Sequence, residues 1–261
     1  MAEPARSRTS RTQIVIADDL AAVARSGADL FVRRAAAAVA SHGRFDAVLS
    51  GGSTPRALHA LLANPPYCDQ VAWEQVQFYW GDERCVPPDA AESNYRMARE
   101  TLLSLVPVAD SQIYRIRGEL LPDEAAAQYE HELRATLNLA AGQLPRFDLL
   151  FLGMGPDGHT LSLFPHTAAL AVRDRLVTAN YVPKLDAQRV TLTYPTANNA
   201  AAAAFLVAGA DKADALAAVL EGPRDPDTYP AQGITLTDGD LYWLVDRAAA
   251  AKLRNTGAAA S

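Results

Sequence analysis

FDLLFLGMGPDGHTLSLFP, residues 147–165, is the stretch from which the fold of this chain follows most directly. It opens with a continuous apolar run at residues 149–152, which is too short to span a membrane. The run also lacks the alternation of a strand with one face in water. This pattern is typical of a strand buried on both faces of a parallel sheet, so an α/β fold is expected.

Glycines break this strand at its carboxyl end, and a carboxylate and an imidazole lie among them. Gly153, Gly155 and Gly158 fall within six residues and are accompanied by Asp157 and His159. Glycine lets the backbone adopt positive φ and approach a ligand closely, while Asp and His can orient or move protons. The segment therefore predicts a catalytic loop. The alternative is a tight strand-to-helix turn whose histidine is only hydrogen-bonded in place.

On both sides of this segment, apolar runs alternate with helical periodicity. Strands are predicted at residues 13–17, 45–49, 76–80, 113–116, 176–181, 189–194, 203–207 and 241–245. Helices are predicted from Asp18 or Asp19 to His42, from Pro55 to about residue 63, after Ser93, at 122–139 and at 209–220. This alternation, without an internal repeat, predicts a doubly wound, mostly parallel sheet with helices on both faces, in a single large domain.

The composition fits a globular enzyme of one domain. The chain has 261 residues, of which 49% are hydrophobic and 21% charged, and no linker-like stretch divides it. We expect one α/β domain over residues 13–254, with a disordered extension at 1–12 and a disordered tail at 255–261. The N-terminal segment has no apolar core ahead of a cleavage site, so it does not resemble a secretory signal.

Charge and cysteine content argue against several classes of function. The formal net charge of −6 disfavours a broad surface for nucleic acid or anionic membranes, so an anionic ligand needs a focused site. Cys68 and Cys85 show no metal-type pairing, and the five histidines show no zinc-type spacing. We therefore expect no metal site, no disulfide scaffold and a cytoplasmic location.

Residues 50–55, SGGSTP, connect a predicted strand to a predicted helix. Glycines and hydroxyls followed by proline at a first helical position present free backbone N–H groups to an anion. Gly51, Gly52, Ser53 and Thr54 are thus candidate phosphate ligands. The spacing fits neither a Walker loop nor GxGxxG. A Ser- and Gly-rich turn with a threonine cap is the alternative.

Charged side chains also occur near the ends of other predicted strands. Asp82 and Arg84 follow the strand at 76–80, where α/β sheets bind ligands, although a salt-bridged surface turn fits equally well. Arg189 begins a strand and faces either a ligand or a surface acid. Lys212 lies in the first turn of a predicted helix, where a cation opposes the helix dipole unless an anion is near.

The loops that follow these strands are expected to emerge on one edge of the sheet. Together they offer an anion cradle, two or three cations, one imidazole and two carboxylates. No GxSxG elbow is present, so an acyl-serine route has little support. The combination predicts proton-transfer chemistry on a small phosphorylated molecule.

Several sequence blocks, taken together, resemble the 6-phosphogluconolactonases of bacteria. They are SGGSTP (50–55), GDERCVPP (81–88), SNYRMARETLL (93–103), LGMGPDGHTLSLFP (152–165), RVTLTYPTANNA (189–200) and GADKADAL (209–216). The similarity extends from about residue 13 to residue 246. The related glucosamine-6-phosphate deaminases have similar loops, but carry glutamate where this chain has Phe164 and tend to have tyrosine where it has Arg84.

This resemblance implies hydrolysis of 6-phosphoglucono-δ-lactone to 6-phosphogluconate, the second step of the oxidative pentose phosphate pathway, without metal or organic cofactor. The 6-phosphate would be held by residues 51–54 with Arg84, Lys212 and Arg189, while His159 takes a proton from the attacking water. Asp157 or Asp82 would orient the imidazole, and the sequence does not decide between them.

Two alternative functions remain open from the sequence, an aldose–ketose isomerase or deaminase of amino-sugar phosphates and a non-catalytic sugar-phosphate sensor. As partners we expect a small phosphorylated sugar lactone but no nucleic acid and no membrane, and we expect a monomer or small homo-oligomer.

Overall fold

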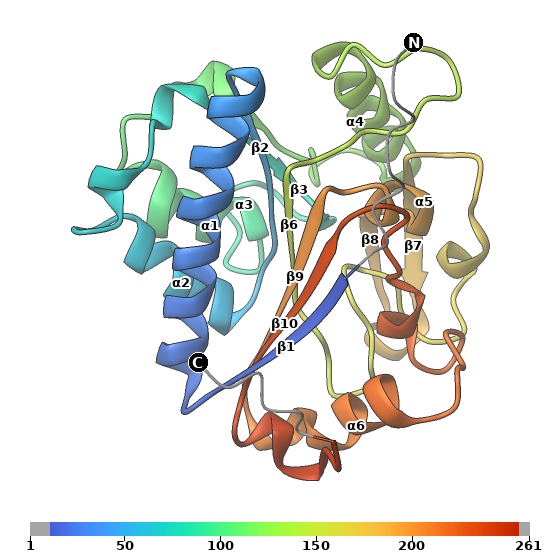
Figure 1. Cartoon of the computed structure of the whole chain (residues 1–261). Coiled ribbons are helices and arrows are strands. Elements are labelled where there is room, and N and C mark those ends of the chain that lie inside the picture. The colour runs from blue at the N-terminus through green and yellow to red at the C-terminus, as the bar shows by residue number, and fades with distance from the viewer. Residues whose placement is uncertain (1–10, 256–261) are drawn as a thin grey trace, which may run out of the picture.

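The computed structural model describes residues 11–255 as an α/β fold (Figure 1). Its strands are β1 (Arg11–Ala17), β2 (Phe45–Leu49), β3 (Val76–Trp80), β4 (Asp82–Arg84), β5 (Ile113–Tyr114), β6 (Leu149–Leu152), β7 (Val177–Val182), β8 (Ala187–Leu192), β9 (Ala202–Val207) and β10 (Asp240–Asp246). Its α-helices are α1 (Leu20–His42), α2 (Ser53–Leu62), α3 (Asn94–Ala98), α4 (Pro122–Thr136), α5 (Tyr194–Asn198) and α6 (Ala213–Glu221).

The predicted disordered ends lie mostly outside the described residues, and their inner boundaries were wrong. Arg11 and Thr12, assigned to the extension, pair with β10 at the start of β1. Asn255, assigned to the tail, donates its backbone N–H to Glu221 Oε1 at 2.7 Å. Backbone pairing does not depend on apolar side chains, so hydropathy alone did not detect these ordered residues.

The central sheet has the strand order β1-β10-β9-β6-β2-β3-β5, and all its neighbouring strands are parallel. The predicted mostly parallel α/β fold is thus confirmed. In Figure 1, α1, α2 and α3 cover one side of the sheet, and α4 and α5 lie on the other. The strands β2, β6 and β9 are buried along their whole length and, apart from Asp46 of β2, consist of apolar residues, as is typical of strands inside a parallel sheet.

A second, antiparallel sheet with the order β4-β8-β7 was not predicted. Residues 82–84, expected to form a loop, are strand β4, which pairs with β8 across more than a hundred residues of sequence. Tyr194 begins α5 instead of ending the strand predicted at 189–194, because Pro195 occupies the first turn of that helix. The second sheet brings the start of β8 to the same edge of the fold as β4.

The ends of two helices follow local rules that the sequence makes visible. Asp19, and not Asp18, caps α1 by accepting a hydrogen bond from Ala22 N at 2.8 Å, and Gly43 ends the helix with φ of 79°. Ser93 caps α3, as predicted, because its Oγ accepts from Arg96 N at 3.1 Å. The second of these helices presents its first residue, Asn94, to the site described below.

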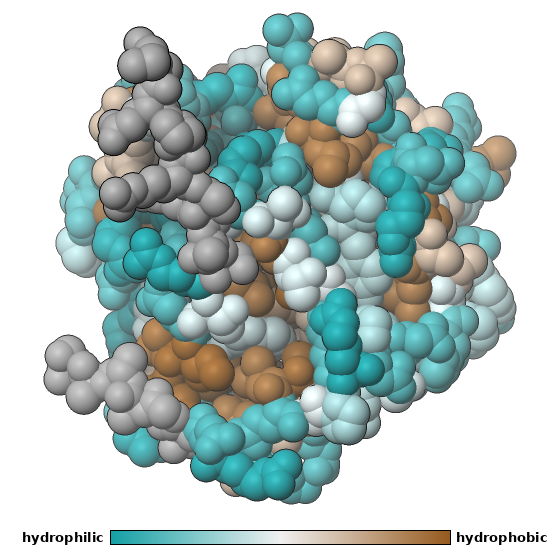
Figure 2. Space-filling model, turned by 45° about the vertical axis from the view of Figure 1, so that its right-hand side comes forward, coloured by the Kyte–Doolittle hydropathy of each residue, from teal (hydrophilic) through white to brown (hydrophobic). Residues whose placement is uncertain are grey.

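Figure 2 shows one face of the molecule, on which hydrophilic residues are interspersed with hydrophobic patches. Within residues 11–255, no helix combines the length and the apolar character needed to cross a membrane.

His59 of α2 makes the stability of the fold sensitive to pH. It is fully buried with Nδ1 3.3 Å from Thr101 Oγ1, and burial, followed by the charge of Arg56, lowers the pKa of His59 from 6.5 to about 4. Between these values the unfolded chain binds a proton that the folded chain excludes, so acidification favours unfolding. We expect this group to cost about 2 kcal/mol of unfolding free energy between about pH 7 and 5.

Urea unfolding across this pH range measures the effect, with His59→Gln and His131→Gln as a matched pair. His131 is exposed on α4. The His59 variant should lose the acid-dependent slope, whereas the His131 variant should keep it. An unchanged slope in His59→Gln would show that the buried imidazole is not its source.

Candidate active site

A pocket of 460 Å³ lies at the carboxyl ends of the central strands. It is bordered by the loops after β2 and β6, which are neighbours in the sheet although the chain continues in opposite directions from them, from β2 to β3 and from β6 to β9. Open α/β sheets bind ligands at such a switch point. All the predicted site residues line this pocket: Gly51, Gly52, Ser53, Thr54, Asp82, Arg84, Asp157, His159, Arg189 and Lys212.

One end of the pocket is formed by the start of α2. Gly52, with φ of 111°, precedes the helix, and no side chain within the described residues caps it. The N–H groups of its first turn are therefore free to bind an anion in the pocket that Ser53 and Thr54 line. Gly51 is needed here for close packing, because a Cβ at this position would lie 1.8 Å from Asn94 Oδ1.

Two arginines lie side by side on neighbouring strands of the second sheet, beside this anion cradle. Arg84 of β4 and Arg189 of β8 are register partners, both are partly buried, and both line the pocket. Burial and then the charge of Arg84 lower the pKa of Arg189 below its usual range. Like charges directly opposite each other destabilise a sheet, so an anion bound between them would relieve a repulsion already present.

Lys212 approaches the pocket from the loop after β9. It ends the short 3-10 helix Ala210–Lys212 and directly precedes α6, and its Nζ lies 2.7 Å from Asp211 Oδ2. The loop is anchored by Asp246 of β10, whose carboxylate accepts a hydrogen bond from Gly209 N at 3.0 Å. Lys212 therefore contributes a third positive charge to the pocket from a fixed backbone.

The imidazole of His159 is held by Asp157. Asp157 Oδ1 lies 2.5 Å from His159 Nδ1, and Asp157 Oδ2 accepts from Lys184 Nζ at 3.0 Å. Burial disfavours the Asp157 carboxylate, but the hydrogen bond and charge of His159, together with Lys184, hold the pKa of Asp157 well below its usual range. An ionised carboxylate only accepts hydrogen bonds, so Nδ1 carries a proton, and in the neutral imidazole the lone pair is therefore on Nε2.

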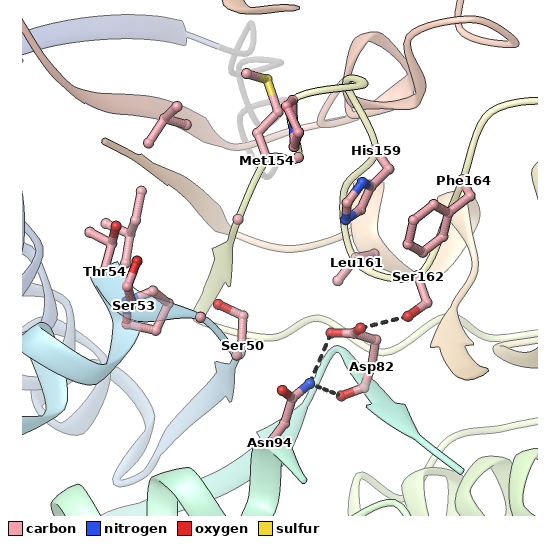
Figure 3. A pocket seen from close by; sticks show the side chains of 18 of the residues that line it. Ser50, Ser53, Thr54, Asp82, Asn94, Met154, His159, Leu161, Ser162 and Phe164 are labelled. Carbon is pink, nitrogen blue, oxygen red and sulfur yellow. Dashed lines mark hydrogen bonds between the residues drawn. The ribbon is translucent and has the colours of Figure 1, made fainter. Parts of the chain in front are cut away.

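Figure 3 shows this imidazole and the anion cradle on different sides of the pocket, with Ser53 and Thr54 on one side and His159 on the other. The loop carrying the imidazole is tightly packed. A Cβ on Gly155 would lie 2.1 Å from His159 Nδ1 and 2.7 Å from Asp157 Oδ1. The glycine that the sequence pattern singled out thus makes room for the His–Asp pair.

Asp82 has different partners. Its Oδ2 accepts from Ser162 Oγ at 2.6 Å, and Asn94 Nδ2 donates to its backbone oxygen at 3.0 Å, as Figure 3 shows. The sequence left open whether Asp157 or Asp82 orients His159. In the structure, the carboxylate bonded to the imidazole is that of Asp157. Asp82 instead lines the pocket together with its partners Asn94 and Ser162.

Sequence reasoning missed the buried residue that joins β4 to the start of α3. Glu83 is 2% exposed, and its carboxylate accepts from the backbone N–H groups of Arg84, Asn94 and Tyr95 and from Ser93 Oγ. Burial raises the pKa of Glu83 despite these hydrogen bonds. The cap that Ser93 predicts marks the start of α3, but nothing local indicates that Glu83 binds the same turn.

Lys184, Ser162 and Phe164 were also not predicted as site residues, although all three line the pocket. Ser162 and Phe164 lie just beyond the His159 loop, so their position along the chain was a usable signal. Lys184 lies between β7 and β8, and its one signal was the scarcity of lysine in the sequence, which has it only at positions 184, 212 and 252. Within residues 11–255, no three His, Cys, Asp or Glu side chains gather into a group able to hold a metal ion.

Comparison with known proteins places the chain in a family. A family model described as glucosamine-6-phosphate isomerases/6-phosphogluconolactonase matches residues 18–243. A 6-phosphogluconolactonase of Nostoc sp. is 42% identical over 244 residues, covering 93% of this chain and 98% of that protein. A probable chloroplastic 6-phosphogluconolactonase 4 of Oryza sativa subsp. japonica is 38% identical over 249 residues, covering 91% of this chain and 75% of that protein.

Solved structures give the same result. A structure described as devB protein superimposes with a TM-score of 0.84 at 34% identity, covering 92% of this chain and 99% of that one. The 6-phosphogluconolactonase of Thermotoga maritima gives 0.77 at 26% identity, covering 90% of this chain and 100% of that one. A monomeric glucosamine-6-phosphate deaminase, at 18% identity and a TM-score of 0.73, shares the fold.

The chain therefore belongs to the family of glucosamine-6-phosphate isomerases and 6-phosphogluconolactonases. Within it, the relatives at 42% and 38% identity carry the name 6-phosphogluconolactonase, so the resemblance drawn from the sequence blocks is confirmed.

Proposed function

We propose that this protein hydrolyses 6-phosphoglucono-δ-lactone to 6-phosphogluconate, the second step of the oxidative pentose phosphate pathway. The names of its relatives support this activity. The observation that carries the proposal is that one pocket holds both the bonded pair His159–Asp157 and an anion cradle surrounded by cationic side chains. Such a pocket can fix a substrate by its phosphate and present a base to its other end.

The substrate phosphate binds at the start of α2. The free N–H groups and hydroxyls at residues 51–54 provide directional hydrogen bonds. Arg84 and Arg189 approach from the second sheet and Lys212 from the loop after β9, so the phosphate receives charge from more than one direction. The sugar hydroxyls then extend over Asp82 toward His159.

Hydrolysis begins with a water molecule whose proton passes to His159 Nε2 as its oxygen attacks the lactone carbonyl carbon. The tetrahedral oxyanion is met by loop N–H groups or by a cationic side chain. When the bond between that carbon and the ring oxygen breaks, the imidazolium returns the proton to the ring oxygen, which becomes a hydroxyl. The Asp157 carboxylate keeps the imidazole in the required tautomer and stabilises its protonated form.

The same residues argue against deaminase chemistry. The resemblance considered above places glutamate in the deaminases at the position of Phe164, which lines this pocket without an ionisable group. Amino-sugar isomerisation would therefore lack one acid–base group. A sensor that only binds its ligand does not require an ionised Asp157 bonded to an imidazole that lines the pocket.

We further propose that the protein works in the cytoplasm, as a monomer or small homo-oligomer, on a small phosphorylated lactone and without a nucleic-acid partner. The absence of a broad basic surface, inferred from the net charge of −6, supports the last point.

A direct assay tests the activity. Purified protein is added to freshly prepared 6-phosphogluconolactone, and ring opening is followed by NMR or acid release against the spontaneous rate. Acceleration is expected, with no ammonia released from glucosamine 6-phosphate. Binding of 6-phosphogluconate without acceleration would support the sensor, and ammonia release would support the deaminase.

A further inference from the structure

Phe164 lies against the imidazole of His159 in a nearly parallel stack. The two ring centroids are 4.0 Å apart and the ring planes differ by 18°. Phe164 is 7% exposed and lines the same pocket as His159 (Figure 3). The phenyl ring packs directly on the imidazole, so its position does not depend on contact with a substrate.

The backbone on both sides of Phe164 is held by buried hydrogen bonds. Asn180 of β7, which is 3% exposed, donates from Nδ2 to Ser162 O at 2.8 Å and to Thr167 Oγ1 at 3.0 Å. Thr167 Oγ1 in turn donates to Phe164 O at 2.8 Å. The aromatic ring is therefore attached to a segment that the second sheet fixes in place.

The hydrogen bond from His159 to Asp157 determines which nitrogen faces the pocket, but it does not by itself fix the plane of the ring. The terminal torsion of a histidine side chain has broad minima, so the imidazole can rock about this contact. A flat neighbour at stacking distance removes that freedom. It also offers its π face to the imidazolium that forms when the base has taken a proton.

We propose that Phe164 is a positioning residue that sets the plane of the His159 imidazole, so that the Nε2 lone pair points at the attacking water. This role rests on the proposed lactonase function. It assigns to Phe164 a contribution to kcat, made through His159, and no contribution to phosphate binding.

The test compares Phe164→Leu, which keeps an apolar side chain but removes the flat ring, with Phe164→Tyr, which retains it. We expect kcat of the leucine variant to fall about 10- to 100-fold, because a small misplacement of a catalytic group is costly. Its KM should remain within about twofold of wild type, since the anion cradle is untouched. The tyrosine variant should keep kcat within about threefold. Thermal unfolding checks that both variants fold.

NMR of the His159 ring gives a readout that does not depend on activity. In the wild-type protein we expect one sharp set of signals with Nδ1 protonated and ring protons displaced by the stacked phenyl ring. In Phe164→Leu this displacement should vanish, and the signals should broaden because the ring plane is no longer fixed, while Nδ1 stays protonated through its bond to Asp157.

Three results would overturn the positioning role. They are an unchanged kcat in a folded Phe164→Leu, a rise in KM at constant kcat, or His159 signals that stay as sharp in that variant as in wild type. A wild-type protein that does not accelerate lactone hydrolysis would instead count against the proposed function. The NMR comparison would then still decide whether Phe164 orders the imidazole.

Discussion

Replacement of His159 by alanine is expected to lower kcat for lactone hydrolysis by about 10²- to 10⁴-fold, the usual contribution of a general base. The pocket should still bind 6-phosphogluconate, because the start of α2 and the cations around it lie apart from the imidazole. The residual rate reflects bound substrate opened by unassisted water. Steady-state kinetics measure the loss, and calorimetric titration with the product measures the retained affinity.

Asp157→Asn gives an independent test of the same mechanism. The asparagine amide can donate a hydrogen bond to Nδ1, which would then become the acceptor and leave the proton on Nε2. The base would be lost although the imidazole remains, so kcat should fall nearly as far as in His159→Ala. His131→Ala, an exposed histidine on α4, is the control and should retain full activity. A His159→Ala variant with more than about a tenth of the wild-type kcat would exclude the general-base role.

The part of the fold that could be predicted is the part encoded by local periodicity. The apolar run at residues 149–152 and the one at 203–207 appear as β6 and β9, and the loops that follow them share one pocket because parallel strands end at the same edge. The buried strands therefore determined both the sheet and the location of the site.

The second sheet could not be derived in this way. Pairing of β4 with β8 joins Asp82 to Thr191 and Arg84 to Arg189, which are far apart in sequence, and β4 has only 3 residues. Side-chain partners were equally hidden. Two acids were available to orient His159, and only the folded loop shows that Asp157 bonds to it while Asp82 bonds to Ser162. Long-range contacts of this kind leave no period in the sequence.

Replacement of Arg84 or Arg189 by alanine is expected to raise KM about 10- to 100-fold with little change in kcat. Charge-assisted hydrogen bonds to a phosphate contribute about 1.5–3 kcal/mol each, and each 1.4 kcal/mol is a factor of ten in affinity. The reacting end of the substrate lies at His159, so the loss should appear in binding and not in the chemical step. Steady-state kinetics on the lactone separate the two, and Arg99→Ala, an exposed arginine outside this pocket, is the control.

For the ligand-free protein, we expect removal of Arg84 to have a favourable effect, on stability, in contrast to the unfavourable effect on binding. Burial and the charge of Arg84 lower the pKa of Arg189, which means that the charged form of Arg189 is less favourable in the folded chain than in the unfolded one. Removing Arg84 relieves that repulsion, so Arg84→Ala should unfold at a slightly higher temperature than wild type without ligand. With saturating 6-phosphogluconate the order should reverse, because the wild-type protein gains more from binding. A variant that is less stable in both conditions would mean that Arg84 holds the second sheet together, and that phosphate binding is not the reason for placing two cations side by side.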